Sequence, residues 1–124
     1  MIDGSAGIAL IDDDASMRRS LGNLLASLGF KVGAYASAEE FLVQRPAGVD
    51  CLVLDLKLPG ISGLELLERL RGSQPDLRVI VLTAHGDAET RRRALALGAA
   101  AFLSKPFRTE DLVTAVRRRD DDRR

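Results

Sequence analysis

Short apolar runs alternate with amphipathic segments five times along this chain of 124 residues. Continuous apolar runs of four or five residues are typical of strands that are buried on both faces of a parallel sheet. The alternation therefore predicts an α/β fold: a flavodoxin-like (βα)5 doubly wound sandwich with a five-stranded parallel sheet in the order 2-1-3-4-5. The predicted strands are Ile8–Ile11, Lys31–Tyr35, Cys51–Leu54, Val79–Leu82 and Ala101–Leu103.

The segments between these runs carry the residue types that begin and end helices. Ser37 and Glu40 have the spacing of a capping box, and Gly29 and Gly98 stand where helices end. The predicted helices run from about Ser16 to Leu28, from the capping box to Gln44, through the leucine-rich segment after Gly60, from Asp87 to Leu97, and onward from a cap at Thr109.

The composition favours one globular domain that does not bind nucleic acid or membranes. Hydrophobic residues make up 46% of the chain, and 18 basic residues balance 18 acidic ones. A net charge of zero lacks the basic face that nucleic-acid or membrane binding requires. A single cysteine, Cys51, and a start without signal-peptide character indicate a reducing, cytoplasmic location.

Polar side chains follow four of the five predicted strands, and the strand without them is expected at the sheet edge. The carboxyl ends of parallel strands meet at one edge of such a sheet, where ligands bind. Each residue also has a simpler reading: Asp14 would cap a helix, and Lys105 would be a surface lysine. Their joint placement instead favours one common site, made of Asp12, Asp13, Asp14, Asp55, Thr83 and Lys105.

Three converging carboxylates need a counter-ion or must take up protons. Two carboxylates ~4–5 Å apart repel by roughly 4 kcal/mol at an effective dielectric constant near 20. Mg²⁺, or Mn²⁺ in its place, binds such hard oxygen ligands together with waters and phosphate. We expect Asp13 and Asp55 to coordinate the metal directly and Asp12 to act through a water molecule.

With its charge masked by the metal, Asp55 can attack an anionic phosphoryl donor as a nucleophile. The transition state spreads charge over three phosphoryl oxygens. The metal would take one oxygen, the Lys105 ammonium a second, and the Thr83 hydroxyl the third. The residues at the strand ends thus predict an aspartyl-phosphate site.

Four ordered motifs resemble those of the receiver domains of bacterial two-component response regulators. They span nearly the whole chain, from about Gly7 to Arg117, and only their combination is specific. The segment Thr83–Asp87 further resembles the FixJ-like subgroup. The motifs are Ile11-Asp12-Asp13-Asp14 with Arg18, Leu54 to Gly60 with Gly63, Thr83-Ala84, and Lys105-Pro106-Phe107.

The resemblance implies a role for each site residue. Asp55 is the phosphoacceptor, and the spacing from Ile11 to Arg18 favours Asp12 and Asp13 over Asp13 and Asp14 as the acidic pair. The remaining roles are a metal contact from the main-chain carbonyl of Lys57, a phosphate partner in Lys105, a switch hydroxyl in Thr83 and a mobile aromatic ring in Phe102. Leu58 stands where many relatives carry Met, a departure that conserves volume.

The resemblance also implies partners. A sensor histidine kinase would donate the phosphoryl group, and the surface of the fourth helix, fifth strand and fifth helix would contact an output domain, a partner or a second copy in a homodimer. Residues 1–119 would form the receiver domain, and the charged tail 120–124 would fray. We expect no specific DNA binding by this chain itself, and a cis bond between Lys105 and Pro106, which costs only about 0.5–1 kcal/mol.

Two other functions use similar chemistry. Aspartyl-phosphate hydrolases also have an aspartate nucleophile and Mg²⁺, but they resemble Asp-x-Asp-x-Thr after the first strand, where this chain has Ala15 after Asp14 and no matching Thr. A flavin carrier on the same fold would need a Ser, Thr or Gly phosphate cradle after that strand. Three aspartates at this place would repel a phosphate instead.

Overall fold

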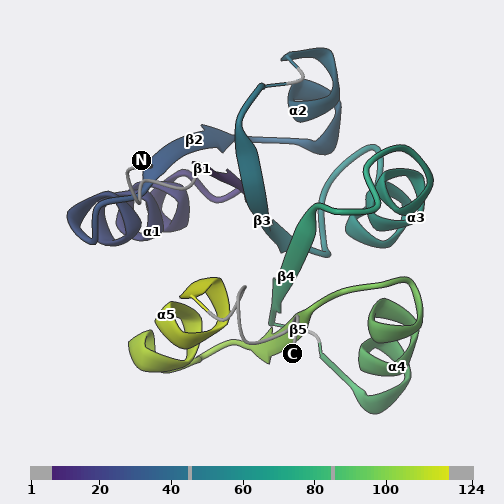
Figure 1. The fold of residues 1–124 in the computed structure, drawn as a ribbon. Helices are drawn as coiled ribbons and strands as arrows, with labels where there is room; N and C mark the ends of the chain where they lie inside the picture. Colours follow the sequence, from purple (N-terminus) through teal and green to yellow (C-terminus); the bar gives the residue numbers. More distant parts are fainter. Residues whose placement is uncertain (1–6, 45, 85, 118–124) are drawn as a thin grey trace.

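The computed structural model describes residues 7–44, 46–84 and 86–117, and within them strands and helices alternate as predicted (Figure 1). The charged tail 120–124 and the predicted domain boundary at residue 119 lie outside the described residues. The strands are β1 (Gly7–Ile11), β2 (Lys31–Tyr35), β3 (Val49–Asp55), β4 (Arg78–Thr83) and β5 (Ala101–Ser104). The helices are α1 (Ala15–Ser27), α2 (Ala38–Gln44), α3 (Gly63–Ser73), α4 (Ala88–Ala96) and α5 (Thr109–Arg117).

All neighbouring strands pair in parallel, and the sheet order is β2-β1-β3-β4-β5, which confirms the predicted topology. The chain reverses its direction of travel across the sheet between β1 and β3, where binding sites form in folds of this kind. Asp55 at the end of β3 pairs with Leu82, so Thr83 lies one residue further along the neighbouring strand.

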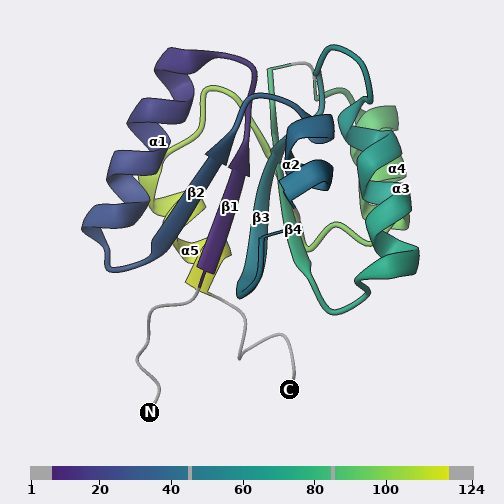
Figure 2. The same cartoon turned by 90° about the horizontal axis from the view of Figure 1, so that it is seen from above.

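Helices cover both faces of the sheet: α1 and α5 lie on one side, and α2, α3 and α4 lie on the other (Figures 1 and 2). Successive residues of a strand point to opposite faces, so each strand contributes to two cores. In β1, Ile8 and Leu10 pack with α1 and α5, whereas Ala9 and Ile11 pack with the other three helices. Burial on both faces explains why the strands appear in the sequence as continuous apolar runs.

Side-chain caps fix where several helices begin. Asp14 caps α1 by accepting hydrogen bonds from Ser16 N at 2.9 Å and Met17 N at 3.1 Å. Asp87 and Ser62 cap α4 and α3 in the same way. Most observed ends fall within one residue of the predicted ones. Thr109, expected as a cap, is itself the first residue of α5.

The predicted capping box of α2 forms with one difference. Ser37 Oγ accepts from Glu40 N at 3.1 Å, as expected, but Glu40 Oε1 accepts from the backbone of Ala36 rather than from that of Ser37, at 2.9 Å. The box therefore ties α2 to the residue that directly follows β2. Over the part of the chain described here, no helix is long and apolar enough to cross a membrane.

Candidate functional site

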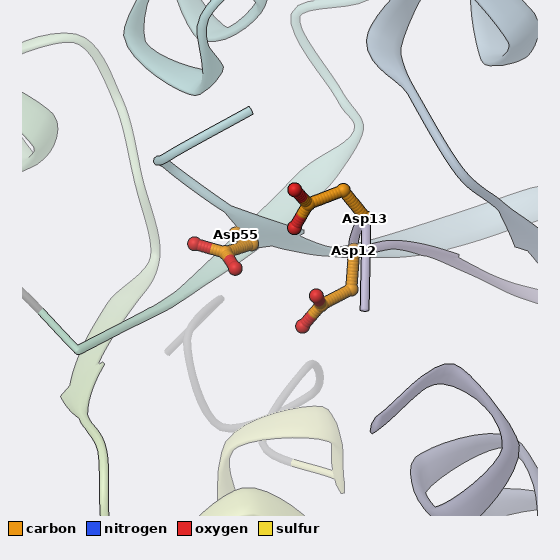
Figure 3. A group of neighbouring side chains, drawn as sticks. All are labelled: Asp12, Asp13 and Asp55. Atoms are coloured by element: carbon orange, nitrogen blue, oxygen red, sulfur yellow. The ribbon is translucent and has the colours of Figure 1, made fainter. Parts of the chain in front are cut away.

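The carboxyl ends of β1, β3, β4 and β5 bring the predicted polar residues to one edge of the sheet. Asp12 and Asp13 follow β1, Asp55 ends β3, Thr83 ends β4, and Lys105 follows β5. Figure 3 shows the carboxylates of Asp12, Asp13 and Asp55 side by side, contributed by the two strands at the centre of the sheet. The sequence prediction that these three residues converge is confirmed geometrically.

The three carboxylates offer ligand atoms that all lie within 4.8 Å of one another. Asp12 is only 2% exposed and Asp55 9%, whereas Asp13 lies exposed at the rim. Two of the three charges are therefore largely removed from water, and the third faces it. An exposed ligand leaves space for the waters that Mg²⁺ keeps when it binds to proteins.

Lys105 is the cationic partner of this acidic cluster. Its Nζ lies 3.2 Å from Asp12 Oδ2 and 3.3 Å from Asp55 Oδ2. Burial alone would lower the pKa of Lys105, but the nearby charges of Asp55 and Asp12 outweigh it and raise the pKa above its usual value. Lys105 therefore stays protonated while it bridges the two carboxylates. The Lys105–Pro106 bond is cis, as predicted.

Asp55 has a raised pKa although Lys105 lies beside it. Burial is the main cause, and the negative charge of Asp12 adds to it. A hydrogen bond from Lys57 N to Asp55 Oδ1, at 3.1 Å, and the charge of Lys105 act in the opposite direction. One lysine does not balance the burial and the repulsion together, so the cluster favours either a proton on Asp55 or a further cation.

Asp12 is held by its backbone as well as by its side chain. Asp12 N donates to Tyr35 O at 3.1 Å, and Arg18 Nη1 donates to Asp12 O at 2.7 Å. Asp12 Oδ1 accepts from the backbone of Asp14 at 2.9 Å, while the Asp14 side chain caps α1. The structure thus separates the three consecutive aspartates: Asp12 and Asp13 lie in the cluster, and Asp14 has the capping role.

The loop after Asp55 returns closely beneath it, and this requires glycine at position 63. A Cβ at Gly63 would lie 2.5 Å from Leu56 Cα and 2.8 Å from Asp55 O. Gly63 N donates to Leu56 O at 3.0 Å and closes the loop. Lys57, the predicted main-chain ligand, belongs to this loop and contacts Asp55 through its N–H. Leu58 is buried.

On the other side of Asp55 lie the two predicted switch residues. Thr83 is 1% exposed, and its carbonyl accepts from Lys105 N at 2.8 Å. Thr83 also lines a cavity of about 210 Å³ with Leu64 and Thr90. Phe102 is half-buried, and its ring lies so close to Gly86 that a Cβ there would be 2.7 Å from Phe102 Cε1.

Sequence reasoning missed three contributions to this site. β2 was expected to add nothing, yet Tyr35 O holds the backbone of Asp12. Glu39, in the first turn of α2, accepts a hydrogen bond from Ile61 N in the loop after Asp55. Gly86 supports the ring of Phe102. The capping-box pattern pointed to Ser37 and Glu40, and the motif segment Thr83–Asp87 includes Gly86, but neither pattern identified these contacts.

Known proteins are similar to this chain in sequence and in fold. The family model for the response regulator receiver domain matches residues 8–117. Nodulation protein W of Bradyrhizobium diazoefficiens is 46% identical over 110 residues, which cover 88% of this chain and 48% of that protein. Transcriptional regulatory protein FixJ of the same organism is 43% identical over 110 residues, covering 88% and 53%, in agreement with the predicted FixJ-like subgroup. The chain spans about half the length of these relatives.

A solved structure gives the same result for the fold. The structure titled "BeF3 Activated DrrB Receiver Domain" superposes with a TM-score of 0.87 at 32% sequence identity, over 94% of this chain and 98% of that one. Fold, sequence and family model agree over the whole described sheet. The chain therefore belongs to the response regulator receiver domains, the phosphorylation-based signalling domains of two-component systems.

Proposed function

We propose that this chain accepts a phosphoryl group on Asp55 from a sensor histidine kinase, with the help of Mg²⁺. The observation that carries the proposal is the Asp55 carboxylate itself. It is nearly buried and lies 3.3 Å from the Lys105 ammonium. Together with Asp12 and Asp13 it offers carboxylate oxygens that lie within 4.8 Å of one another, close enough to bind one metal ion. The chain acts as a phosphoacceptor in signalling and not as an enzyme on a separate substrate.

The donor set fits Mg²⁺ or Mn²⁺. Three carboxylates and one lysine leave the cluster with excess negative charge, and all the offered atoms are hard oxygens. Asp13 and Asp55 would bind the ion directly, Asp12 through a water molecule, and the Lys57 main-chain carbonyl would complete the protein ligands. When bound, the ion neutralises the carboxylates and withdraws charge from one phosphoryl oxygen.

In the transfer step, an oxygen of Asp55 attacks phosphorus and forms a new P–O bond. The bond from phosphorus to the imidazole nitrogen of the kinase breaks, and its electron pair stays on that nitrogen. The Lys105 ammonium, already beside Asp55, pairs with one phosphoryl oxygen, and the Thr83 hydroxyl donates to another.

Phosphorylation of Asp55 would change the conformation of Thr83 and Phe102. A phosphoryl group on Asp55 adds acceptor oxygens that draw Thr83 inward, and the ring of Phe102 fills the space released beside β5. The surface formed by α4, β5 and α5 then changes shape. We propose this surface as the contact with an output domain, a partner or a second copy of the chain, because the matched relatives are about twice as long.

The proposal includes boundaries and limits. Residues 1–119 form the receiver domain and 120–124 a charged tail, in a protein that works in the cytoplasm. Specific binding to DNA is assigned to an output domain of a longer protein and not to these 124 residues, whose net charge is zero. A shift of a promoter fragment by this chain alone, at moderate salt, would contradict that assignment.

Intact mass spectrometry tests the central step. With Mg²⁺ and acetyl phosphate, the chain should gain the mass of one phosphoryl group, and Asp55→Asn should gain none. Asp14→Asn is the matched control, because asparagine caps a helix as well as aspartate does and Asp14 lies outside the cluster. Labelling of Asp55→Asn at the level of the unaltered chain would overturn the assignment of Asp55.

A further inference from the structure

The loop between β3 and α3 is fixed at its two ends. Lys57 N donates to Asp55 Oδ1 at 3.1 Å, and Gly63 N donates to Leu56 O at 3.0 Å. Between these bonds, Pro59 and Gly60 are exposed to solvent. The exposed middle of the loop therefore needs a contact from another element if Lys57 is to keep a constant position.

Glu39 of α2 supplies that contact. Its Oε2 accepts a hydrogen bond from Ile61 N at 2.9 Å, across 22 positions of sequence. The carboxylate also fills the place where residue 60 would carry a side chain, since a Cβ on Gly60 would lie 2.2 Å from Glu39 Oε2 and 3.0 Å from Glu39 Cδ. Gly60 has a φ of +72°, so the loop turns at this point in a conformation that favours glycine.

The helix that carries Glu39 is itself tied to the acidic cluster. Tyr35 O, at the end of β2, accepts from Asp12 N, and the Tyr35 ring packs edge-on against Phe41 of α2 with a centroid distance of 5.5 Å. The capping box holds the start of α2 to Ala36. The β2–α2 corner thus contacts both segments that supply the acidic residues: the one after β1 and the one after β3.

Glu39 could also be an ordinary acidic residue in the first turn of a helix, where it would favour the helix dipole. Its environment indicates more than that. The pKa of Glu39 is held below its usual value chiefly by the N–H of Ile61, then by its own backbone N–H, with a smaller contribution from the charge of Arg69 on α3. The largest contact that favours the ionised form thus lies outside its own helix.

We propose that Glu39 is a positioning residue for phosphoryl transfer: by holding Ile61 N it fixes the β3–α3 loop, and with it the Lys57 carbonyl, relative to Asp55. The inference rests on the proposed function, since it assigns Glu39 a role through the metal ligands. Groups that orient metal ligands typically change metal affinity about 10–100-fold when they are removed. Because Glu39 is exposed, we expect the low end, about tenfold.

The test measures Mg²⁺ affinity of the full chain by calorimetry, together with hydrogen exchange of the Ile61 amide. Glu39→Ala should weaken Mg²⁺ binding about tenfold and speed exchange at Ile61. Glu39→Gln keeps an acceptor oxygen and should recover part of both losses. The control is Glu68→Ala: Glu68 is exposed on α3, and the described residues give its carboxylate no hydrogen bond or ion pair.

Phosphorylation rates distinguish positioning from stability. At saturating Mg²⁺, the rate of labelling by acetyl phosphate in Glu39→Ala should return to within about twofold of the unaltered chain, because the metal then restores the loop. If Glu39→Ala lowers the melting temperature but leaves Mg²⁺ affinity unchanged, Glu39 is structural only and the inference is wrong. If affinity falls as expected but Asp55 is never labelled in the unaltered chain, Glu39 still positions the metal ligands, but the proposed function fails and with it any role of Glu39 in phosphoryl transfer.

Discussion

The two sides of Asp55 are built from different kinds of contact. On the acidic side, directional hydrogen bonds hold each backbone segment, such as Asp12 N to Tyr35 O, Lys57 N to Asp55 Oδ1 and Ile61 N to Glu39 Oε2. On the switch side, Lys105 N donates to Thr83 O, whereas the ring of Phe102 packs close to Gly86 and Thr83 lines a cavity.

The difference corresponds to what each side has to do. A metal site tolerates only small errors in ligand position, and hydrogen bonds fix direction as well as distance. A switch needs two arrangements of similar free energy, and packing contacts without direction can be exchanged for others. The acidic side should therefore respond to substitution by losing binding, and the switch side by changing the balance between two states.

The largest effect is expected on the acidic side, at Asp13. Asp13→Ala removes a proposed direct ligand, so Mg²⁺ affinity should fall by more than the roughly 100-fold that marks the upper end for groups around a metal site. Asp14→Asn, one residue further on, should leave the affinity unchanged because Asp14 caps α1. Calorimetric titration of both variants measures the contrast. Equal losses would mean that the acidic pair is Asp13 and Asp14.

Thr83→Ala should separate the two sides. The variant keeps every acidic residue, so it should still accept a phosphoryl group. It lacks the hydroxyl that would move inward to hydrogen-bond the phosphoryl group on Asp55. A coupling of about 1–3 kcal/mol between Asp55 and the α4–β5–α5 surface would be lost. Fluorine-labelled Phe102 reports on this coupling when beryllofluoride is added. A response equal to that of the unaltered chain would show that the hydroxyl is not the trigger.

Gly86→Ala should alter the switch side alone. The new methyl group would lie 2.7 Å from both Phe102 Cε1 and Ser104 Oγ, so the ring must move and the unfolding free energy should fall by about 1–3 kcal/mol. Adding Phe102→Leu should recover part of this loss. Gly22→Ala is the control and should instead raise the unfolding free energy. A Cβ at Gly22 would have no atom within 4 Å, and alanine in place of glycine stabilises a helix by about 0.5–1 kcal/mol. Urea unfolding measures all four chains.

The contrast between the sides also explains what could be predicted from the sequence. The sheet order and Asp12, Asp13, Asp55, Thr83 and Lys105 were accessible, because buried parallel strands are apolar throughout and their carboxyl ends meet at one edge. Which two of the three aspartates form the acidic pair could be predicted only in part from the sequence, since any of them could cap α1. The sequence offered Asp14 for this role, and the structure shows Asp14 capping α1.

The supporting contacts were not accessible from the sequence. Glu39 and Ile61 lie 22 residues apart, and an exposed glutamate in the first turn of a helix has an adequate local explanation. Gly86 contacts Phe102 because the loop after β4 approaches the neighbouring strand β5, which depends on side-chain shape and not on residue pattern. Contacts of this kind depend on tertiary packing, about which periodicity gives no information.

The smallest effect concerns the stability of the acidic side without metal. Burial, with repulsion from Asp12, raises the pKa of Asp55, so the native state holds the proton of Asp55 more tightly than the unfolded chain does. This contribution to stability is therefore greatest at low pH and is lost as the pH rises through the raised value. At neutral pH the ionised carboxylate opposes folding, and Asp55→Asn should increase the unfolding free energy by about 1 kcal/mol in Mg²⁺-free buffer, a modest gain because water screens the rim of the cluster.

Adding Mg²⁺ should reverse this order of stability. The unaltered chain gains the free energy of binding the ion, whereas Asp55→Asn has lost a ligand and gains less. Urea unfolding at neutral pH, with and without Mg²⁺, measures both differences, and Asp76→Asn provides an exposed control on the α3–β4 connection. If Asp55→Asn were less stable than the unaltered chain in the absence of metal, the Lys105 contacts would already balance the buried charge. The acidic side would then be complete without a cation, and the reason to expect one there would be gone.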